Sequence, residues 1–356
     1  MKYDVVIVGG GPAGLYVAFN INNLDVVVLE EHFRVGIPKH CAGLVGKWTA
    51  DIVSKVSQRL ITNKYSSVKF LTPAGVFDAH SKNPLAYHVD RPGLEEVLAN
   101  LVESKGHVLV TGERAKPLQG FKVRTSKQEL EYEFLVIAEG ANGVFRRSFI
   151  GTCEDYILGI QVVARTKSPL DENTLIIVYD SAYNPEFFAW VIPLDSTLVK
   201  IGFAAKKPQL KYIEYIAKKA GVEIASTLEK FGGLIPLYEP LKNPVVADKV
   251  VFHGDAVPLI KPYTGGGLFY IFSLSPVLAK YIESGKLPEY GSEFKRKFLV
   301  KVLMERKIVE IFRRTRYFLP AKPVSRMSKL GLLTPRDYDY HLLLLAKSLP
   351  LAPLLL

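Results

Sequence analysis

The feature that most constrains this chain is a glycine-rich turn set between two apolar segments at its N-terminus. Residues 1–30 read MKYDVVIVGGGPAGLYVAFNINNLDVVVLE and predict a strand from Tyr3 to Val8, a helix, and a second strand that ends at Glu30. Gly9, Gly11 and Gly14 have the G-x-G-x-x-G spacing, which lets the backbone approach a pyrophosphate beside the free N–H groups of a helix start. The whole pattern predicts a dinucleotide-binding unit with contacts from Gly9, Gly11, Pro12, Ala13, Gly14, Glu30 and Glu31.

The composition fits a protein with more than one domain. The chain has 356 residues, of which 48% are hydrophobic, and this is enough for two domains and a large core. Its only cysteines, Cys41 and Cys153, do not make a disulfide framework and indicate a reducing compartment, so we expect a cytoplasmic protein. No apolar run reaches the roughly 18 residues that cross a bilayer. We therefore expect a soluble chain that can also associate peripherally with a membrane surface.

Positive charge is concentrated near the C-terminus. Residues 294–330 contain twelve lysines and arginines against two acids, Glu305 and Glu310, and so carry +10 of the net charge of +11. Such a segment suits an anionic lipid surface or an acidic protein. In a helix the basic residues would surround the cylinder, which favours a solvated helix over one that lies in a membrane surface. We expect no nucleic acid partner, because no aromatic-lined groove or recognition module accompanies the basic residues.

The middle of the chain predicts two kinds of sheet. The apolar runs before residue 150 continue the parallel sheet that begins at the N-terminus, and a helix is expected between Asp90 and Gly106. Residues 155–205 alternate in β fashion and are rich in aromatic side chains, which indicates an antiparallel sheet. Further short strands are expected at 68–71, 76–79, 108–111, 122–125 and 250–253, a helix at 210–220, and mainly helices from residue 288 onward.

Two later motifs indicate which dinucleotide is bound. An apolar strand runs directly into Glu139-Gly140, and another runs into Gly254-Asp255, after which three glycines at 265–267 precede a long apolar helix. An aspartate at a strand end can bond ribityl hydroxyls, and a glycine-flanked helix start can stabilise the anion of a reduced isoalloxazine. NAD would need no such distant second site. The three motifs together therefore favour FAD.

These motifs resemble those of the flavoproteins of para-hydroxybenzoate hydroxylase type. The patterns ADGAxS and GDAAGxxxPxxGGG of that group correspond to AEGANG at 138–143 and GDAVPLIKPYTGGG at 254–267. Within the group, the loop GIPKHCAGL at 36–44, the segment PEFFAWVIP at 185–193 and the helical C-terminal extension resemble the geranylgeranyl reductase family. The family pattern P-x-x-Y-x-W-x-F-P is matched except that Phe188 replaces the tyrosine and Ile192 replaces the phenylalanine. The resemblance covers about residues 1–290.

The resemblance implies an α/β architecture, α+β overall, in three parts. A Rossmann-like FAD-binding domain would comprise residues 1–65, 84–150 and 245–290. An inserted antiparallel-sheet substrate domain would comprise residues 66–83 and 151–244. A basic helical C-terminal region would comprise residues 291–356.

The resemblance also implies further site residues. Those expected to contact FAD are Cys41, Ala42, Gly43, Arg91, Glu139, Gly140, Gly254, Asp255, Gly265, Gly266 and Gly267. Hydride delivery to an isolated alkene needs an apolar, water-poor slot, and the aromatic segment can form one wall of it. Strand alternation places Phe188 and Trp190 on one side and Phe187 and Ala189 on the other. The expected substrate contacts are Phe188, Trp190, Ile192, Pro193 and Tyr263.

An alkene also needs a proton at its second carbon. His40 and Cys41 lie on the glycine loop that, by resemblance, passes the isoalloxazine, and they are the candidate proton donors. A loop histidine with satisfied hydrogen bonds and an inert thiol are the open alternatives. No metal site is expected.

The implied function is the FAD-dependent saturation of isoprenoid C=C bonds in geranylgeranyl-type lipids, as in archaeal members of the family. No second G-x-G-x-x-G occurs, so electrons must come from an external donor, either NAD(P)H or a ferredoxin-type carrier. Two alternatives stay open. One is a flavin monooxygenase or halogenase-like enzyme, although Phe188 interrupts the W-x-W-x-I-P pattern expected of halogenases. The other is a non-catalytic flavoprotein that binds isoprenoids.

Overall fold

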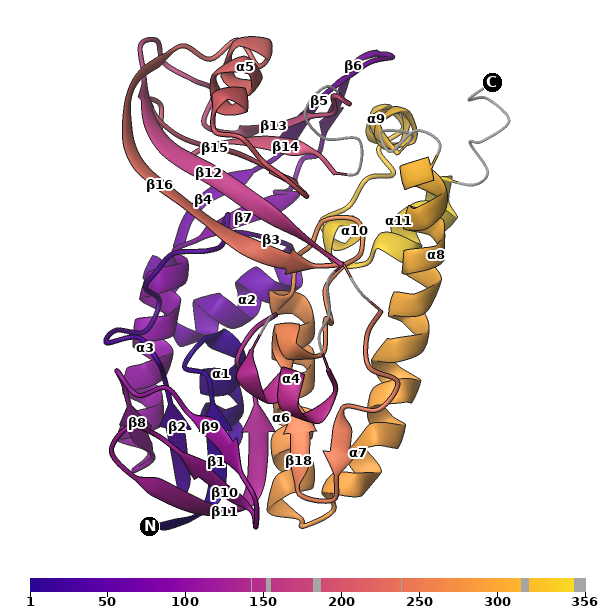
Figure 1. The fold of residues 1–356 in the computed structure, drawn as a ribbon. Helices are drawn as coiled ribbons and strands as arrows, with labels where there is room; N and C mark the ends of the chain where they lie inside the picture. The colour runs from indigo at the N-terminus through magenta and orange to yellow at the C-terminus, as the bar shows by residue number, and fades with distance from the viewer. Residues whose placement is uncertain (142, 152–154, 182–186, 238, 315–319, 349–356) are drawn as a thin grey trace. The chain divides into compact units, whose positions relative to one another are not determined.

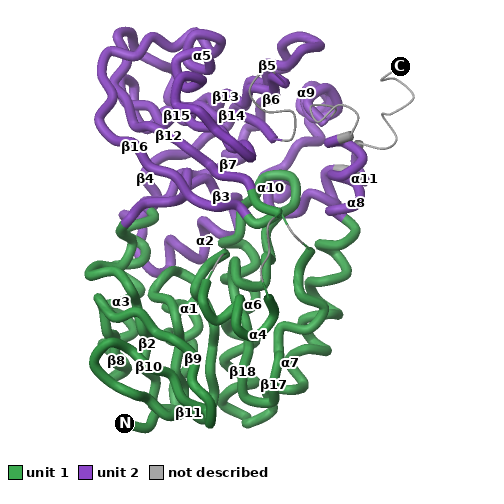
Figure 2. The backbone as a smooth tube through the Cα atoms, viewed as in Figure 1, with its two compact units in different colours: residues 1–37, 91–156, 236–304 green, residues 38–90, 157–235, 305–356 purple. Residues whose placement is uncertain are grey.

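The computed structural model describes residues 1–356 except 142, 152–154, 182–186, 238, 315–319 and 349–356 (Figure 1). The chain divides into two compact units (Figure 2). The first comprises residues 1–37, 91–156 and 236–304, and the second comprises residues 38–90, 157–235 and 305–356. Of the residues whose structure is described, no helix is both long and apolar enough to cross a membrane.

The first unit is built on a mostly parallel sheet. Its main strand order is β17-β18-β11-β1-β2-β8, in which β18, β11, β1, β2 and β8 run parallel and β17 adds an antiparallel edge. Strands β9 and β10 extend the N-terminal part of β11. The sheet strands are β1 (Lys2–Val8), β2 (Val26–Leu29), β8 (Val108–Val110), β9 (Lys116–Leu118), β10 (Lys122–Arg124), β11 (Glu129–Ile137), β17 (Val245–Ala247) and β18 (Val250–Phe252). The four residues of β2 are all buried, as is typical of a parallel strand covered on both faces.

Helices of the first unit pack around the start of the chain. Helix α1 begins at Pro12 directly after the glycine turn and packs against α3 and α6. The helices are α1 (Pro12–Asn20), α3 (Arg91–Ser104), α4 (Val144–Phe149), α6 (Leu268–Glu283), α7 (Leu287–Phe294), a π-helical turn (Lys295–Leu299) and α8 (Val300–Arg314), which continues into the second unit. A 3-10 turn at Gly254–Ala256 follows β18.

The second unit contains a seven-stranded sheet and a three-stranded one. The larger sheet has the order β16-β12-β15-β14-β13-β5-β6 and the smaller has the order β3-β7-β4. The strands are β3 (Leu44–Val45), β4 (Ile61–Tyr65), β5 (Ser67–Thr72), β6 (Gly75–His80), β7 (Ala86–Val89), β12 (Tyr156–Thr166), β13 (Thr174–Val178), β14 (Ala189–Pro193), β15 (Leu198–Ala205) and β16 (Ile224–Pro236). The helices are α2 (Lys47–Val56), a 3-10 turn (Gln58–Leu60), α5 (Lys211–Lys219), α9 (Ala321–Lys329), α10 (Arg336–Asp339) and α11 (His341–Ser348).

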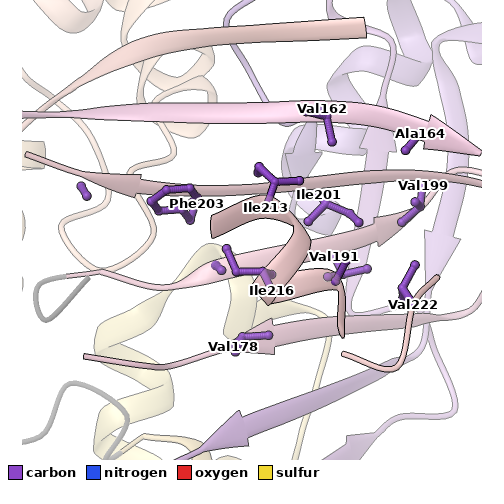
Figure 3. Packing of buried hydrophobic residues seen from close by; sticks show 13 residues of the cluster. Val162, Ala164, Val178, Val191, Val199, Ile201, Phe203, Ile213, Ile216 and Val222 are labelled. Carbon is purple, nitrogen blue, oxygen red and sulfur yellow. The ribbon is translucent and has the colours of Figure 1, made fainter. Parts of the chain in front are cut away.

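The larger sheet buries one face against α5. Alternate residues of the strands, among them Ala189, Val191 and Ile201, pack with Ile213 and Ile216 of α5 in one apolar cluster (Figure 3). Because side chains alternate along a strand, the residues between them belong to the opposite face of the sheet. That face carries Trp190 and Ile192 of β14.

The predicted α/β fold with a helical C-terminal region is confirmed, with three differences in detail. The larger sheet is not wholly antiparallel, because β5 and β13 pair in parallel. Residues 38–65 and 84–90, expected in the nucleotide-binding domain, belong to the second unit. They are held there by hydrogen bonds such as that from the Tyr65 hydroxyl to the Pro193 carbonyl, at 2.7 Å. Residues 305–356 also join the second unit.

Candidate functional site

The glycine turn of the first unit is fixed by close backbone approach. Gly9 has φ of 109°, and a Cβ there would overlap the carbonyl of Ala138 at the end of β11. A Cβ at Gly14 would overlap the carbonyl of Gly9. At Gly11, by contrast, a Cβ would meet no atom within 4 Å, so this glycine leaves open space at the start of α1. Pro12 takes the first position of α1, where no helical N–H is needed. The turn is therefore shaped for a ligand at the helix start.

Glu30 is held at the end of β2 by two hydrogen-bonded groups. One carboxylate oxygen accepts the N–H of Gly10 at 2.7 Å, and the other accepts the N–H of His32 at 2.8 Å and lies 2.6 Å from its Nδ1. The residue is 9% exposed. The oxygen that accepts the Gly10 N–H keeps a further acceptor site for a ribose hydroxyl, which is the chemistry predicted for this acid. Glu31 is exposed and pairs with Arg114, the two charged groups lying 3.3 Å apart.

The second motif meets the first through β11. The carboxylate of Glu139 accepts the backbone N–H groups of Phe145 and Arg146 at 3.0 and 2.6 Å and so caps α4. Burial raises the pKa of this carboxyl, while the N–H groups at the helix start oppose the rise. Gly140 has φ of 82° and open space around it. The capping role of Glu139 was not foreseen, and its contact with a dinucleotide stays a prediction.

The third motif closes onto the same helix start. Gly254 has φ of 65°, and a Cβ there would lie 2.6 Å from the Cβ of Ala13 in α1. The Arg146 guanidinium donates to the Ala256 carbonyl at 2.7 Å and ties α4 to this motif. Asp255 is half-buried, and a Cβ at Gly267 would lie 3.1 Å from its Oδ1. The structure thus brings the three predicted motifs together around the start of α1.

The loop before α6 is ordered by its own backbone. The N–H of Lys261 donates to the Gly266 carbonyl at 3.0 Å, and the N–H of Gly265 donates to the Lys261 carbonyl at 2.8 Å. Tyr263 lies half-buried in this loop. Arg91 begins α3 and forms an ion pair with Glu95 at 2.7 Å, with both side chains mostly buried. The open space at Gly11 and Gly140 and the acceptors of Glu30 fit a dinucleotide cofactor.

In the second unit, the loop that carries His40 and Cys41 is fastened at each residue. Lys39 pairs with Glu229 at 2.8 Å, and Nδ1 of His40 lies 3.0 Å from the Gly232 carbonyl. The Gln161 amide donates to the His40 carbonyl at 3.3 Å. The N–H of Gly43 points at the sulfur of Cys41, 3.4 Å away. His40 is exposed and Cys41 is half-buried. The other cysteine, Cys153, lies outside the described residues.

A buried polar pair behind this loop was missed by sequence reasoning. Lys200 of β15 is 7% exposed, and its Nζ donates to the Ala42 carbonyl at 2.8 Å and approaches His88 Nε2 at 3.0 Å. His88 is also 7% exposed, and its Nδ1 lies 2.6 Å from the hydroxyl of Thr62. Burial and the nearby Lys200 charge lower the pKa of His88 to about 3. Burial lowers the pKa of Lys200 to about 8. The available signal was a single lysine inside the apolar strand LVKIGFAA.

The aromatic residues predicted to bind substrate form one cluster. The ring of Phe188 lies 6.2 Å from that of Trp190 and 6.0 Å from that of Tyr179, both in edge contacts. The Phe187 ring stacks on Phe188 at 4.4 Å, so the prediction that Phe187 faces away is wrong; regular strand geometry begins only at Ala189. Ile192 and Pro193 are buried, and the Pro193 carbonyl accepts the Tyr65 hydroxyl. Pro185 lies outside the described residues.

The parallel sheet, the glycine turn, and the two later motifs define an FAD-type flavoprotein, and this prediction is confirmed. The chain belongs to the family described as lycopene cyclase protein, whose model matches residues 4–312. No group of three or more histidine, cysteine or acidic side chains suited to a metal occurs among the residues that the structure places.

Relatives of known sequence agree with the predicted resemblance. The chain is 26% identical to a geranylgeranyl diphosphate reductase of Rhodobacter capsulatus, over 83% of this chain and 82% of the relative. It is 25% identical to a digeranylgeranylglycerophospholipid reductase of Methanothermobacter thermautotrophicus, over 97% of this chain and 99% of the relative. The resemblance to geranylgeranyl reductases is therefore confirmed.

Solved structures share the fold. A geranylgeranyl bacteriochlorophyll reductase-like protein of Thermoplasma acidophilum aligns with a TM-score of 0.80 at 18% identity, covering 98% of this chain and 97% of the other. The halogenase PltM aligns with a TM-score of 0.69 at 16% identity, covering 95% and 85%. Reductases and halogenases thus share this architecture, and the choice between their chemistries must come from the site residues.

Proposed function

We propose that this protein is an FAD-dependent reductase that saturates isoprenoid C=C bonds of geranylgeranyl-type lipids. The glycine turn, Glu30, and the segments at 139–140, 254–255 and 265–267 would hold the cofactor. Bound FAD, once reduced by an external donor, would supply the hydride. The family relatives named as geranylgeranyl reductases support this choice of substrate class.

The observation that carries the proposal is the surroundings of Trp190. A Cβ at Gly202 would come within 2.7 Å of the indole ring, and a Cβ at Gly159 would come within 3.9 Å, so the ring occupies space next to two glycines of the sheet. Its Nε1 is buried and has no hydrogen-bond partner among the described residues. The Phe188 ring lies in edge contact with Trp190 and with Tyr179, so these three side chains form an uncharged aromatic wall, while Lys200 lies on the same face of the sheet with its Nζ bound to the Ala42 carbonyl. Such a wall suits an uncharged polyisoprenoid chain better than a polar aromatic substrate.

The loop residues divide into a reacting group and a positioning group. Nδ1 of His40 is engaged with the Gly232 carbonyl, which suits a histidine that orders the loop. Within the described part of the chain, the Cys41 sulfur receives only the long N–H contact from Gly43, at 3.4 Å. We therefore take Cys41 as the proton donor to the second alkene carbon and His40 as a positioning residue.

External partners follow from the charge distribution. The basic segment at 294–330 would receive an acidic electron carrier, while NAD(P)H would instead act directly at the flavin. The same segment would contact anionic lipid when the substrate is drawn from a membrane.

The proposal is tested by mixing reduced holoprotein with a geranylgeranyl lipid in the absence of oxygen. Reoxidation of the flavin at a rate that depends on lipid supports the reductase. Flavin that stays reduced until oxygen is admitted would instead identify a monooxygenase or halogenase-like enzyme. For a third outcome, Trp48, the other tryptophan of the chain, is replaced by phenylalanine so that the fluorescence reports Trp190 alone. Lipid that quenches this fluorescence while the flavin stays reduced would identify a binding protein.

A further inference from the structure

Lys200 is a buried lysine that has no role in the chemistry proposed above. It stands on the face of β15 opposite the α5 cluster, next to Ile201, which packs into that cluster. Its Nζ donates to the Ala42 carbonyl at 2.8 Å, approaches His88 Nε2 at 3.0 Å, and lies 5.8 Å from the centre of the Phe231 ring. Lysine is rarely buried to this extent, because removing an ammonium group from water is costly. A functional role is one reason for keeping it.

His88 and Thr62 fix the direction in which Lys200 donates. An ammonium group has only donors, so His88 must accept at Nε2 and carry its proton on Nδ1. Nδ1–H then donates to the Thr62 hydroxyl, 2.6 Å away. Burial keeps His88 neutral, which is the form that this arrangement requires. The loop that carries Cys41 packs closely against the His88 ring, since a Cβ at Gly43 would lie 2.9 Å from His88 Nε2.

Lys200 is also coupled to the thiol of the loop. After burial, the ionisable neighbours that affect the pKa of Lys200 are Cys41, Lys39, Glu229 and Asp90. Its hydrogen bond to Ala42 holds the residue next to Cys41 in the chain. Because burial lowers the pKa of Lys200 to about 8, its ammonium group gives up a proton more readily than an exposed lysine does.

We propose that Lys200 restores the proton of Cys41 after each reduction, and that His88 and Thr62 position Lys200 for this task. This inference rests on the proposed alkene reduction. One alkene carbon receives a hydride with its electron pair, and the other takes the proton of the Cys41 thiol, leaving a thiolate. The thiolate takes a proton from Nζ of Lys200, and the neutral amine regains a proton from water. No further oxidant or reductant is needed.

The test measures how Lys200 affects the reactivity of the Cys41 thiol, and it needs no lipid substrate. In a Cys153→Ser background, Cys41 is the only thiol, and its alkylation by iodoacetamide can be followed by mass spectrometry across the alkaline range in the FAD-bound full chain. We expect Lys200→Met to slow alkylation near neutral pH by about tenfold, because a nearby cation favours the thiolate. Lys200→Arg keeps the charge and should stay within about threefold of the parent.

Lys167→Met is the matched control, because Lys167 is an exposed lysine of the same unit paired with Glu223. It should leave the alkylation profile unchanged. Circular dichroism and flavin content establish that each variant is folded. If Lys200→Met does not fold, His88→Gln takes its place, and the same slowing is expected from the loss of a fixed ammonium. An alkylation profile that matches the parent in the folded variant would overturn the inference.

The two proposals can fail separately. Slowed alkylation without any lipid-dependent flavin oxidation would uphold the coupling between Lys200 and Cys41 and contradict the alkene reduction. Lipid-dependent oxidation of the flavin with an unchanged alkylation profile would support the reductase and show that Lys200 does not supply the proton.

Discussion

Nζ of Lys200 lies 3.0 Å from Nε2 of His88, and both side chains are more than nine-tenths buried. Two basic side chains face each other in the second unit, and neither forms an ion pair with a carboxylate of the residues that the structure describes. Only a neutral His88 makes this arrangement stable, since two buried cations at this distance would repel strongly. The relationship links the stability of the second unit to pH.

Lys200 should make stability rise in the alkaline range. Its pKa is lowered from 10.5 to about 8 on folding, so the unfolded chain binds more protons between these values and the free energy of unfolding rises with pH across them. The rise attributable to Lys200 is about 3 kcal/mol. Urea unfolding of the wild type and Lys200→Met at the two ends of this range should show the difference. Equal slopes in the two proteins would contradict the assignment.

The glycine turn offers a matched pair of substitutions. Gly9→Ala places a methyl group against the Ala138 carbonyl at φ of 109°, so it should destabilise the apoprotein by at least about 2 kcal/mol. Gly11→Ala meets open space and should leave apoprotein stability within about 0.5 kcal/mol. Its methyl would occupy the approach of the cofactor, so the Kd for FAD should rise at least about tenfold. If Gly11→Ala binds FAD as tightly as the wild type, the glycine turn is not part of the cofactor site.

Glu139 should behave as a helix cap. Glu139→Ala removes the acceptor for the N–H groups of Phe145 and Arg146, and we expect a loss of about 1 to 2 kcal/mol in the free energy of unfolding. Glu133→Ala is the control, because Glu133 is an exposed acid on the same strand, and its effect should be below about 0.5 kcal/mol. Denaturant titration separates the two. A Glu139 variant as stable as the control would show that the cap contributes nothing.

The basic segment at 294–330 should make reduction by a protein carrier sensitive to salt. Raising ionic strength from about 0.05 to 0.5 M shortens the screening length severalfold and should slow flavin reduction by an acidic ferredoxin-type donor by more than about tenfold. Reduction by NAD(P)H should change much less, since it needs no docking of a protein surface. Stopped-flow absorbance of the flavin measures both rates. Equal salt dependence for the two donors would show that the basic segment does not dock the electron carrier.

The cofactor motifs could be predicted from the sequence because their physics is local. Gly9 must be a glycine because the Ala138 carbonyl approaches it closely, and Glu30 must follow the end of a strand to bond the turn. Such local requirements fix the spacing of these residues in the sequence, and residues 9–30 fold as that spacing predicts. The paired role of Lys200 and His88 could not be predicted in this way. Their contact joins residues 112 positions apart and depends on which face of β15 is covered by α5.

The central claim is that hydride and proton from this protein are added across an isoprenoid double bond. The most direct measurement is the mass of a geranylgeranyl lipid after anaerobic incubation with reduced holoprotein, set against the amount of flavin oxidised. The account predicts a gain of two hydrogens for each flavin oxidised, and a much smaller yield with Cys41→Ser. Unchanged lipid, or a product that contains oxygen or halogen and forms only in air, would contradict it.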